Sequence, residues 1–260
     1  MSALATPTRS RLTPSRADGA VFKAELALFR REPGSLFWIM IFPTGLFVVL
    51  GTIPVFREVG EAIPGMRLID VYVPIAILTS LLMASVQAMP PVITGYREQG
   101  ILRRMSTTPV RPATVLGAQM ALHGIAALVS AALTISVGAL AFDVPLPKQG
   151  LGYLLALALS VCAALSLGAL LSALSRTSKA ANAVGAVAFF PMMFSAGLWM
   201  PVQTMPDMLG RIMEVLPFGA ASQALSAAGA GDWPSLTHLG ALALWTVLLT
   251  GAAARWFRWE

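Results

Sequence analysis

Charged side chains are scarce in this chain of 260 residues, of which 12% are charged and 57% are hydrophobic. Their distribution is uneven, because six long runs contain no Asp, Glu, Lys or Arg. These runs are 33–56, 71–96, 112–142, 149–175, 180–206 and 233–254. A helix needs about 20 apolar residues to cross a bilayer, so each run is long enough. The composition therefore excludes a water-soluble enzyme and predicts an integral membrane protein.

Groups that commonly carry chemistry are missing as well. Cys162 is the only cysteine, which excludes a disulfide framework and a thiolate metal site. His123 and His238 lie in different runs without a zinc-motif neighbour, and we interpret both as packing residues. The runs contain no carboxylate for an ion-coupled carrier, and no lysine follows a glycine as an ATPase phosphate loop requires. We expect no catalytic residue, no metal and no cofactor bound by this chain.

The positions of the basic residues predict a membrane topology. A net charge of +6 could indicate nucleic-acid binding, but 14 of the 18 Lys and Arg residues lie in alternate segments outside the runs. Segments rich in Lys and Arg stay in the cytoplasm, so we expect both termini there and no nucleic-acid partner. The predicted fold is an all-α integral membrane protein with six transmembrane helices. They cover about 35–53, 72–92, 114–142, 151–174, 181–200 and 236–254.

The N-terminal segment divides into two parts. Residues 1–19 are rich in Ser, Thr, Pro and Arg, which predicts a disordered cytoplasmic arm. Residues 20–32 predict an amphipathic interface helix, because Phe22, Leu26 and Phe29 recur at helical spacing. The remainder, 33–260, is predicted to form one transmembrane domain.

Prolines are expected to disturb the spans and to shape the segment that joins the last two. Pro43 should kink the first span, and Pro90 with Pro91 should prevent an undisturbed helix beyond that point of the second. Between the fifth and sixth spans, apolar residues from Leu209 to Leu216 predict an external amphipathic helix. The glycine- and serine-rich stretch 215–231 predicts a re-entrant or interfacial segment that does not span the membrane.

The loop after the second span, residues 94–113, resembles the coupling loop of permease subunits of ABC type-2 exporters. In that family an acidic residue, a glycine, an apolar pair, a basic residue and a Thr-Pro turn dock on the ATPase subunit. The matching residues are Glu98, Gly100, Leu102, Arg103, Thr108 and Pro109, to which we add Arg97 and Arg104. In the alternative interpretation, the basic residues of this loop only set the membrane topology and contact no ATPase.

A second stretch, 191–218, is similar to the fifth span and the following external segment of the same family. It contains Pro191, Ser195 and Gly197 and then several spaced prolines, although Ala196 is inserted between the serine and the glycine. The resemblance covers residues 20–260. It implies a plasma-membrane location with membrane lipids as neighbours, and a cytoplasmic ABC ATPase in two copies that holds ATP and Mg. It also implies a dimer with a second copy or a paralogous permease. The ratio of 15 Arg to 3 Lys residues indicates that the membrane is a bacterial one.

The resemblance further implies a substrate path between the second and fifth spans. The candidate lining residues are Thr79, Met83, Gln87, Asn182, Phe189, Met193 and Phe194. Met and Phe form an adaptable apolar wall, and the chain has only three tyrosines to stack on sugars. This favours export of an amphipathic drug, antibiotic or lipid-like molecule, as in multidrug efflux and antibiotic resistance. The alternatives are export of a lipid-linked glycan or lipo-oligosaccharide, and a non-transporting scaffold or sensor whose loop binds anionic lipid.

Overall fold

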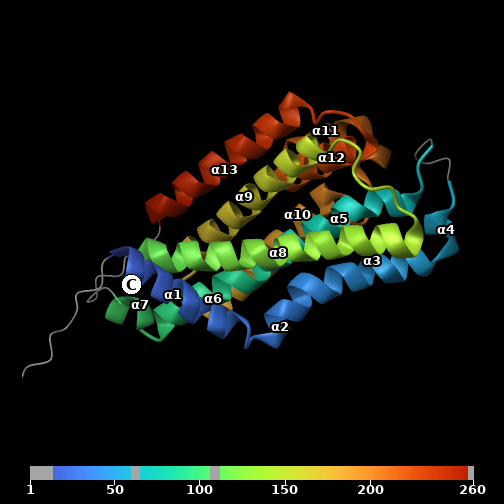
Figure 1. Cartoon of the computed structure of the whole chain (residues 1–260). Coiled ribbons are helices and arrows are strands. Elements are labelled where there is room, and N and C mark those ends of the chain that lie inside the picture. Colours follow the sequence, from blue (N-terminus) through green and yellow to red (C-terminus); the bar gives the residue numbers. More distant parts are fainter. Residues whose placement is uncertain (1–13, 60–64, 106–111, 257–260) are drawn as a thin grey trace, which may run out of the picture.

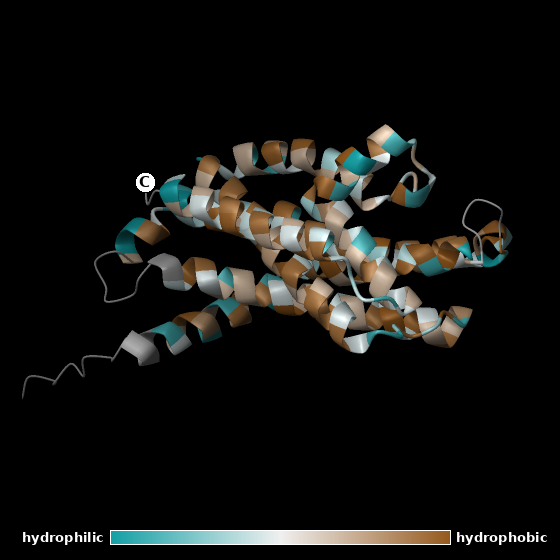
Figure 2. Ribbon diagram, turned by 90° about the horizontal axis from the view of Figure 1, so that it is seen from above, coloured by the Kyte–Doolittle hydropathy of each residue, from teal (hydrophilic) through white to brown (hydrophobic). Residues whose placement is uncertain are grey.

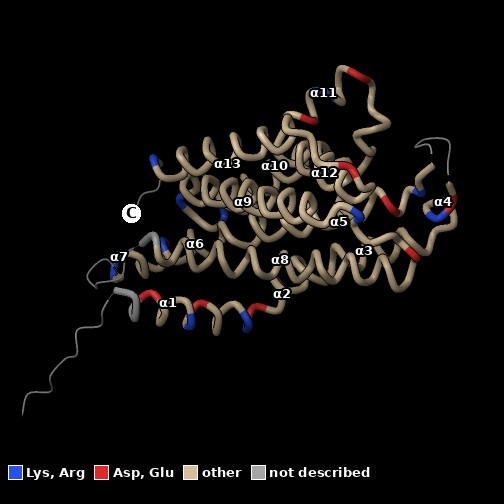
Figure 3. Tube along the Cα trace, turned by 45° about the horizontal axis from the view of Figure 1, so that its top comes forward, with Lys and Arg blue, Asp and Glu red and all other residues tan. Residues whose placement is uncertain are grey.

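The computed structural model describes residues 14–59, 65–105 and 112–256. These residues form helices that lie side by side in an elongated bundle (Figure 1). Hydrophobic residues dominate along the helices (Figure 2), and the charged residues gather at the two ends of the bundle and along α1 (Figure 3). Five of the described helices are long and apolar enough to cross a membrane: Pro33–Thr52, Leu68–Glu98, Thr114–Phe142, Gly150–Leu174 and Leu236–Trp256. The chain is therefore a multi-pass helical membrane protein.

The predicted fifth span corresponds to α10, Ser178–Ala196, which is not among those five. Its first turns contain Ser178, Lys179 and Asn182, and these polar residues reduce its hydropathy. The helix nevertheless runs antiparallel to the whole second span. Ser178 at its start contacts Glu98, and Leu198 just beyond its end accepts a hydrogen bond from Tyr72 at 3.1 Å. These contacts place the two ends of α10 beside the second span near Glu98 and Tyr72, although α10 has 19 residues and the second span has 31.

The first helix, α1, covers Pro14–Phe29 and begins earlier than the predicted boundary at residue 20. Residues 14–19 of the predicted arm are therefore helical, whereas 1–13 lie outside the described residues. Phe22 and Phe29 face the bundle as expected, but Leu26 is exposed and Glu25 is buried in its place. The inward face of α1 is rotated with respect to the predicted apolar stripe.

Pro43 disturbs the first span, and Pro90 with Pro91 disturbs the second. In each case the distortion lies in the helical turn just before the proline. The first span consists of α2 (Pro33–Leu36), the π-helical turn η1 (Phe37–Ile41) and α3 (Phe42–Thr52). The second consists of α5 (Leu68–Leu82), the π-helical turn η2 (Met83–Ala88) and α6 (Met89–Glu98). Because proline lacks an N–H, the missing hydrogen bond belongs to a carbonyl four residues earlier. The expected break after Pro90 and Pro91 is therefore wrong, since the helix continues through them to Glu98.

A side chain of the second span replaces the hydrogen bond that is lost in the first span. Pro43 leaves the carbonyl of Ile39 without its helical donor, and the Ser80 hydroxyl donates to that carbonyl at 2.8 Å.

On the second span, the backbone of η2 packs against glycines of two neighbouring helices. A Cβ at Gly168 would overlap the Ser85 carbonyl oxygen, and one at Gly185 would lie 2.8 Å from the Val86 carbonyl oxygen. Only glycine permits these close approaches.

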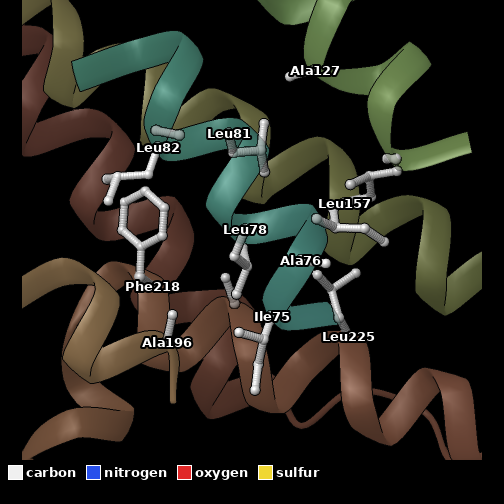
Figure 4. Packing of buried hydrophobic residues seen from close by; sticks show 14 of the residues in the cluster. Ile75, Ala76, Leu78, Leu81, Leu82, Ala127, Leu157, Ala196, Phe218 and Leu225 are labelled. Atoms are coloured by element: carbon white, nitrogen blue, oxygen red, sulfur yellow. The ribbon is translucent and has the colours of Figure 1, made fainter. Parts of the chain in front are cut away.

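The core is centred on α5, which other helices surround (Figure 4). Ile75, Leu78 and Leu82 of α5 are at most 1% exposed. Their neighbours come from α8 (Pro112–Phe142), α9 (Gly150–Leu174), α10 and α12 (Pro217–Ala230). The last span, α13 (Leu236–Trp256), packs on α9 and α12 at the edge of the bundle. The second span is thus the central element.

The segment between α10 and α13 forms three short helices. They are η3 (Val202–Thr204), α11 (Asp207–Val215) and α12. Leu209 and Met213 of α11 are partly buried, whereas Ile212 is 51% exposed. Phe218 and Leu225 of α12 are buried in the core, so α12 packs within the bundle.

Arg67 joins the start of the second span to the end of the third. Its guanidinium forms a bidentate ion pair with Asp70, with the shorter contact, Nη2 to Oδ1, at 2.7 Å. It also donates to the carbonyls of Phe142 and Asp143, both at 3.0 Å. The hydrogen bond from Arg67 to Asp70 raises the pKa of Arg67 above its usual value, so the guanidinium stays charged. The short helix α4 (Pro54–Arg57) lies nearby.

Candidate functional site

The C-terminal end of α6 holds two other helices through adjacent charged residues. Arg97 donates from Nη1 to the carbonyl oxygens of Ser172 at 3.3 Å and Ser175 at 2.5 Å. These carbonyls lie at the C-terminal end of α9, where a helix has unsatisfied acceptors and negative potential. Arg97 therefore caps α9.

Glu98 makes the complementary contact with the start of α10. Its Oε2 accepts a hydrogen bond from the Ser178 hydroxyl at 2.7 Å. The N-terminus of a helix attracts negative charge, and Thr177 caps the same end by accepting the Ala180 N–H at 3.1 Å. We call Arg97 and Glu98 together the α6 clamp, because they fix the end of the central span to both sides of the α9–α10 connection.

The rest of the predicted coupling loop continues from the α6 clamp. Gly100 has a φ of 64°, a left-handed conformation that glycine adopts without strain, and it ends α6. The short helix α7 (Ile101–Met105) follows. Leu102 is 2% exposed, whereas Arg103 and Arg104 are exposed. The predicted Thr108 and Pro109 lie outside the described residues.

A buried acid connects α1 to the same region. Glu25 is 7% exposed, and its Oε2 accepts hydrogen bonds from the Tyr96 hydroxyl at 2.8 Å and the Gln119 amide at 2.6 Å. Tyr96 directly precedes the α6 clamp, and Gln119 belongs to α8. Burial raises the pKa of Glu25 above its usual value, while the two hydrogen bonds act in the opposite direction. One carboxyl group thus joins three helices.

The neighbouring histidine has a packing environment. His123 is fully buried, and its Nδ1 lies 2.9 Å from the Gln119 carbonyl oxygen. The ring of Phe29 meets it edge-on with centroids 5.0 Å apart. Among the described residues, no group of three or more His, Cys, Asp or Glu side chains could hold a metal ion.

The predicted path residues fall into separate groups. Met83, Gln87 and Asn182 line a groove made of two adjoining hollows of about 440 and 450 Å³. Gln87 contributes to both hollows, and Trp38 and Ser35 of the first span form the opposite wall. The groove therefore lies between the first span, the second span and the start of α10, and it extends to the α6 clamp.

The other four predicted path residues lie outside this groove. Thr79 and Met193 are buried in the core, where the Thr79 hydroxyl lies 3.5 Å from the Met193 sulfur. Phe189 and Phe194 are partly buried in an aromatic group with Phe190 and Trp199. The structure brings together the three predicted residues nearest the α6 clamp and leaves these four in packing positions.

Sequence reasoning missed several residues of this region. Glu25 was detectable, because it follows Phe22 by three residues and precedes Phe29 by four, as a residue of the inward face does. Ser178 was not, because a serine at the start of a helix is an ordinary cap. Its contact with Glu98 depends on how distant helices pack.

Comparison with known proteins gives consistent matches. A family model described as "ABC-2 type transporter" matches residues 18–228. The Bacillus subtilis (strain 168) protein named "Putative transport permease YvfS" is 24% identical over 232 residues, which are 87% of this chain and 92% of that protein. The Escherichia coli (strain K12) protein named "Inner membrane transport permease YhhJ" is 25% identical over 185 residues, or 67% of this chain and 49% of YhhJ. The matched part is thus about half the length of YhhJ.

Proposed function

The chain is a permease subunit that belongs to the ABC-2 type transporter family, and from that premise we propose that it exports an amphipathic drug, antibiotic or lipid-like molecule across the bacterial plasma membrane. Membership of the family implies association with an ABC ATPase, and the permease is not itself the enzyme. In the proposed assembly two ATPase subunits hold ATP and Mg, and two permeases, identical or paralogous, form the path. Both termini of the chain lie in the cytoplasm.

The observation that carries the proposal is the α6 clamp. A push from an ATPase on α7 and the loop after it would reach α6 directly. Because Arg97 and Glu98 hold the end of α9 and the start of α10, these ends would move together with α6. The groove residue Gln87 lies in η2, which directly precedes α6 in the second span, and Asn182 lies in α10. Movement at the clamp would therefore change access to the groove, which is what alternating access requires.

The composition of the groove supports an amphipathic substrate. Trp38 and Met83 offer apolar, polarisable surface, while Gln87 and Asn182 offer hydrogen bonds. Export of a lipid-linked glycan or lipo-oligosaccharide is the second candidate, because the polar part of the groove could hold a sugar. The third is a scaffold or sensor, which would have no ATPase partner.

The first test is to purify the chain from its native membrane in mild detergent and identify the co-purifying proteins by mass spectrometry. We expect an ABC ATPase in comparable amount, with ATP hydrolysis stimulated by amphipathic dyes such as ethidium. Stimulation by lipid-linked oligosaccharide instead would favour the glycan exporter. Repeated recovery without an ATPase, under conditions that preserve a known exporter complex, would favour the scaffold.

The second test concerns the clamp itself. Glu98→Lys reverses the charge that meets the positive N-terminal end of α10, so we expect dye efflux to fall to background while membrane insertion stays normal. Glu58→Lys is the matched control, since Glu58 is an exposed acid beyond α4, at the other end of the bundle. Full efflux by a normally expressed Glu98→Lys variant would contradict the coupling role.

A further inference from the structure

A separate hollow, which we call the outer cavity, lies at the end of the bundle opposite the α6 clamp. It has a volume of about 330 Å³ and is enclosed by the start of α5, the connection between α8 and α9, the start of α9 and the end of α12. Backbone hydrogen bonds close one side, since the N–H groups of Lys148 and Gln149 donate to the carbonyls of Gly229 and Ala228. Its volume is at the lower end of the range for sites that bind small molecules.

The walls of this outer cavity are apolar and its rim is exposed. Val71, Val144 and Leu225 are buried and form part of the lining, together with Pro74. Pro145 and Ala230, at the rim, are exposed. A ligand would therefore enter from the membrane surface and place an apolar body against the buried wall.

Two hydroxyl groups of the lining residues lack hydrogen-bond partners. Tyr153 is 6% exposed, and neither its hydroxyl nor the buried hydroxyl of Ser226 has a partner among the described residues. A buried polar group without a partner destabilises the protein, so such groups usually have one. Either hydroxyl could donate a hydrogen bond to an oxygen of a bound ligand.

The charge at the rim favours an anion. Lys148 is exposed and forms no ion pair within the described parts of the chain. The carboxylate of Asp70 also lines the cavity, but it is neutralised by its bidentate contact with Arg67. The exposed Asp143 lies near Arg67, to which it contributes its carbonyl oxygen. Lys148 is thus the only Lys or Arg among the described lining residues, and no carboxylate forms an ion pair with it there.

We propose that this outer cavity binds a small amphipathic anion, with its apolar part against Val71, Pro74 and Leu225 and its anionic oxygens near Lys148, Tyr153 and Ser226. The ligand is either a free single-chain carboxylate or the anionic headgroup region of a membrane lipid. The proposal does not depend on the direction or substrate of transport, because it concerns residues outside the groove and the α6 clamp.

The test uses the full chain in phosphatidylcholine nanodiscs and a decanoate that bears a photoreactive diazirine. We expect saturable labelling of peptides that contain residues 65–74, 144–153 and 225–230. Unlabelled decanoate should suppress it, whereas decanol should need about fivefold higher concentration because it lacks the charge. A second set of nanodiscs contains phosphatidylglycerol. Suppression of labelling by this lipid assigns the site to a membrane headgroup, and unchanged labelling assigns it to the free anion.

Three variants separate specific binding from partition into the bilayer. Lys148→Gln should weaken binding about fivefold and Tyr153→Phe about three- to tenfold, through loss of a charge and of a donor. Lys179→Gln, an exposed lysine at the start of α10, should bind normally. Equal competition by decanol and decanoate on the unaltered chain would overturn the proposal. Labelling spread over the exposed faces of α9 and α13 would do the same.

Discussion

Glu25 shows how one side chain makes the attachment of a helix depend on pH. Its raised pKa means that the folded protein binds the proton more tightly than the unfolded chain does. Its contribution to stability is therefore fully present below the usual pKa of 4.5 and is lost as the pH rises through the higher folded-state value. We expect the midpoint of thermal unfolding to decrease over this window.

Glu25→Gln keeps the shape of the side chain and an acceptor oxygen but cannot ionise. We expect this variant to remove the pH dependence above about pH 4.5 and to raise the unfolding midpoint at neutral pH. The measurement is thermal unfolding of the detergent-purified chain between about pH 4.5 and 7.5. Glu58→Gln, which changes an exposed acid at the other end, is the control. An unaltered pH profile in Glu25→Gln would show that another group titrates.

The same residue marks a limit of prediction from sequence. Helical spacing correctly placed Phe22 and Phe29 on the inward face of α1, because apolar burial dominates the choice of face. The same spacing also places Glu25 on that face, but it could not show which groups would satisfy a buried carboxylate there. Tyr96 and Gln119 satisfy the carboxylate, and they belong to helices far away in sequence.

At the scale of helices, the close contact between α9 and η2 makes glycine necessary at one position. Gly168→Ala would place a methyl group against the Ser85 carbonyl, which is backbone and cannot rotate away. We expect a loss of about 1–3 kcal/mol of stability or failure to assemble. Thermal unfolding together with size-exclusion chromatography would detect either result.

Gly240→Ala is the matched control for this prediction. An added Cβ at Gly240 of α13 meets nothing within 4 Å, so the change should be neutral or stabilising by up to about 1 kcal/mol. Equal behaviour of the two variants would mean that α9 and η2 do not pack as described.

Helix positions were predictable where the membrane imposes them. The charge-free runs locate five spans, because ionised groups are expensive in a bilayer and accumulate at helix ends. The position of the proline distortion was predicted on the wrong side of Pro90 and Pro91. The missing N–H of a proline affects the turn before it, and the π-helical turn η2 therefore precedes both prolines.

For the whole molecule, the distribution of charge leads to a test of orientation. Lys148 and Lys179 lie just before α9 and just after it, and the 25 residues of this helix extend over about 37 Å. In a Cys162→Ala background, Lys148→Cys should react with a membrane-impermeant maleimide on intact cells. Lys179→Cys should react only after permeabilisation, because basic loops remain in the cytoplasm. The reverse pattern would invert the proposed topology.

The general organisation of the molecule followed from sequence, and the composition of the site followed only in part. The family assignment is confirmed by the match over residues 18–228. The groove was not predictable in detail, because Trp38 and Ser35 reach it only through packing of the first span beside the second. The roles of the α6 clamp, the groove and the loop residues Thr108 and Pro109 stay predictions.

The hydrogen bond from Ser80 to Ile39 has an evolutionary consequence. Pro43 and Ser80 are far apart in sequence, yet one removes a donor and the other supplies it. A descendant that first replaced Pro43 would regain the backbone N–H, after which Ser80 could change at little cost. The opposite order passes through a protein with a buried carbonyl and no donor for it. The order in which the two residues can be substituted is therefore constrained, and Ser80 becomes tolerant of change only after Pro43 has been replaced.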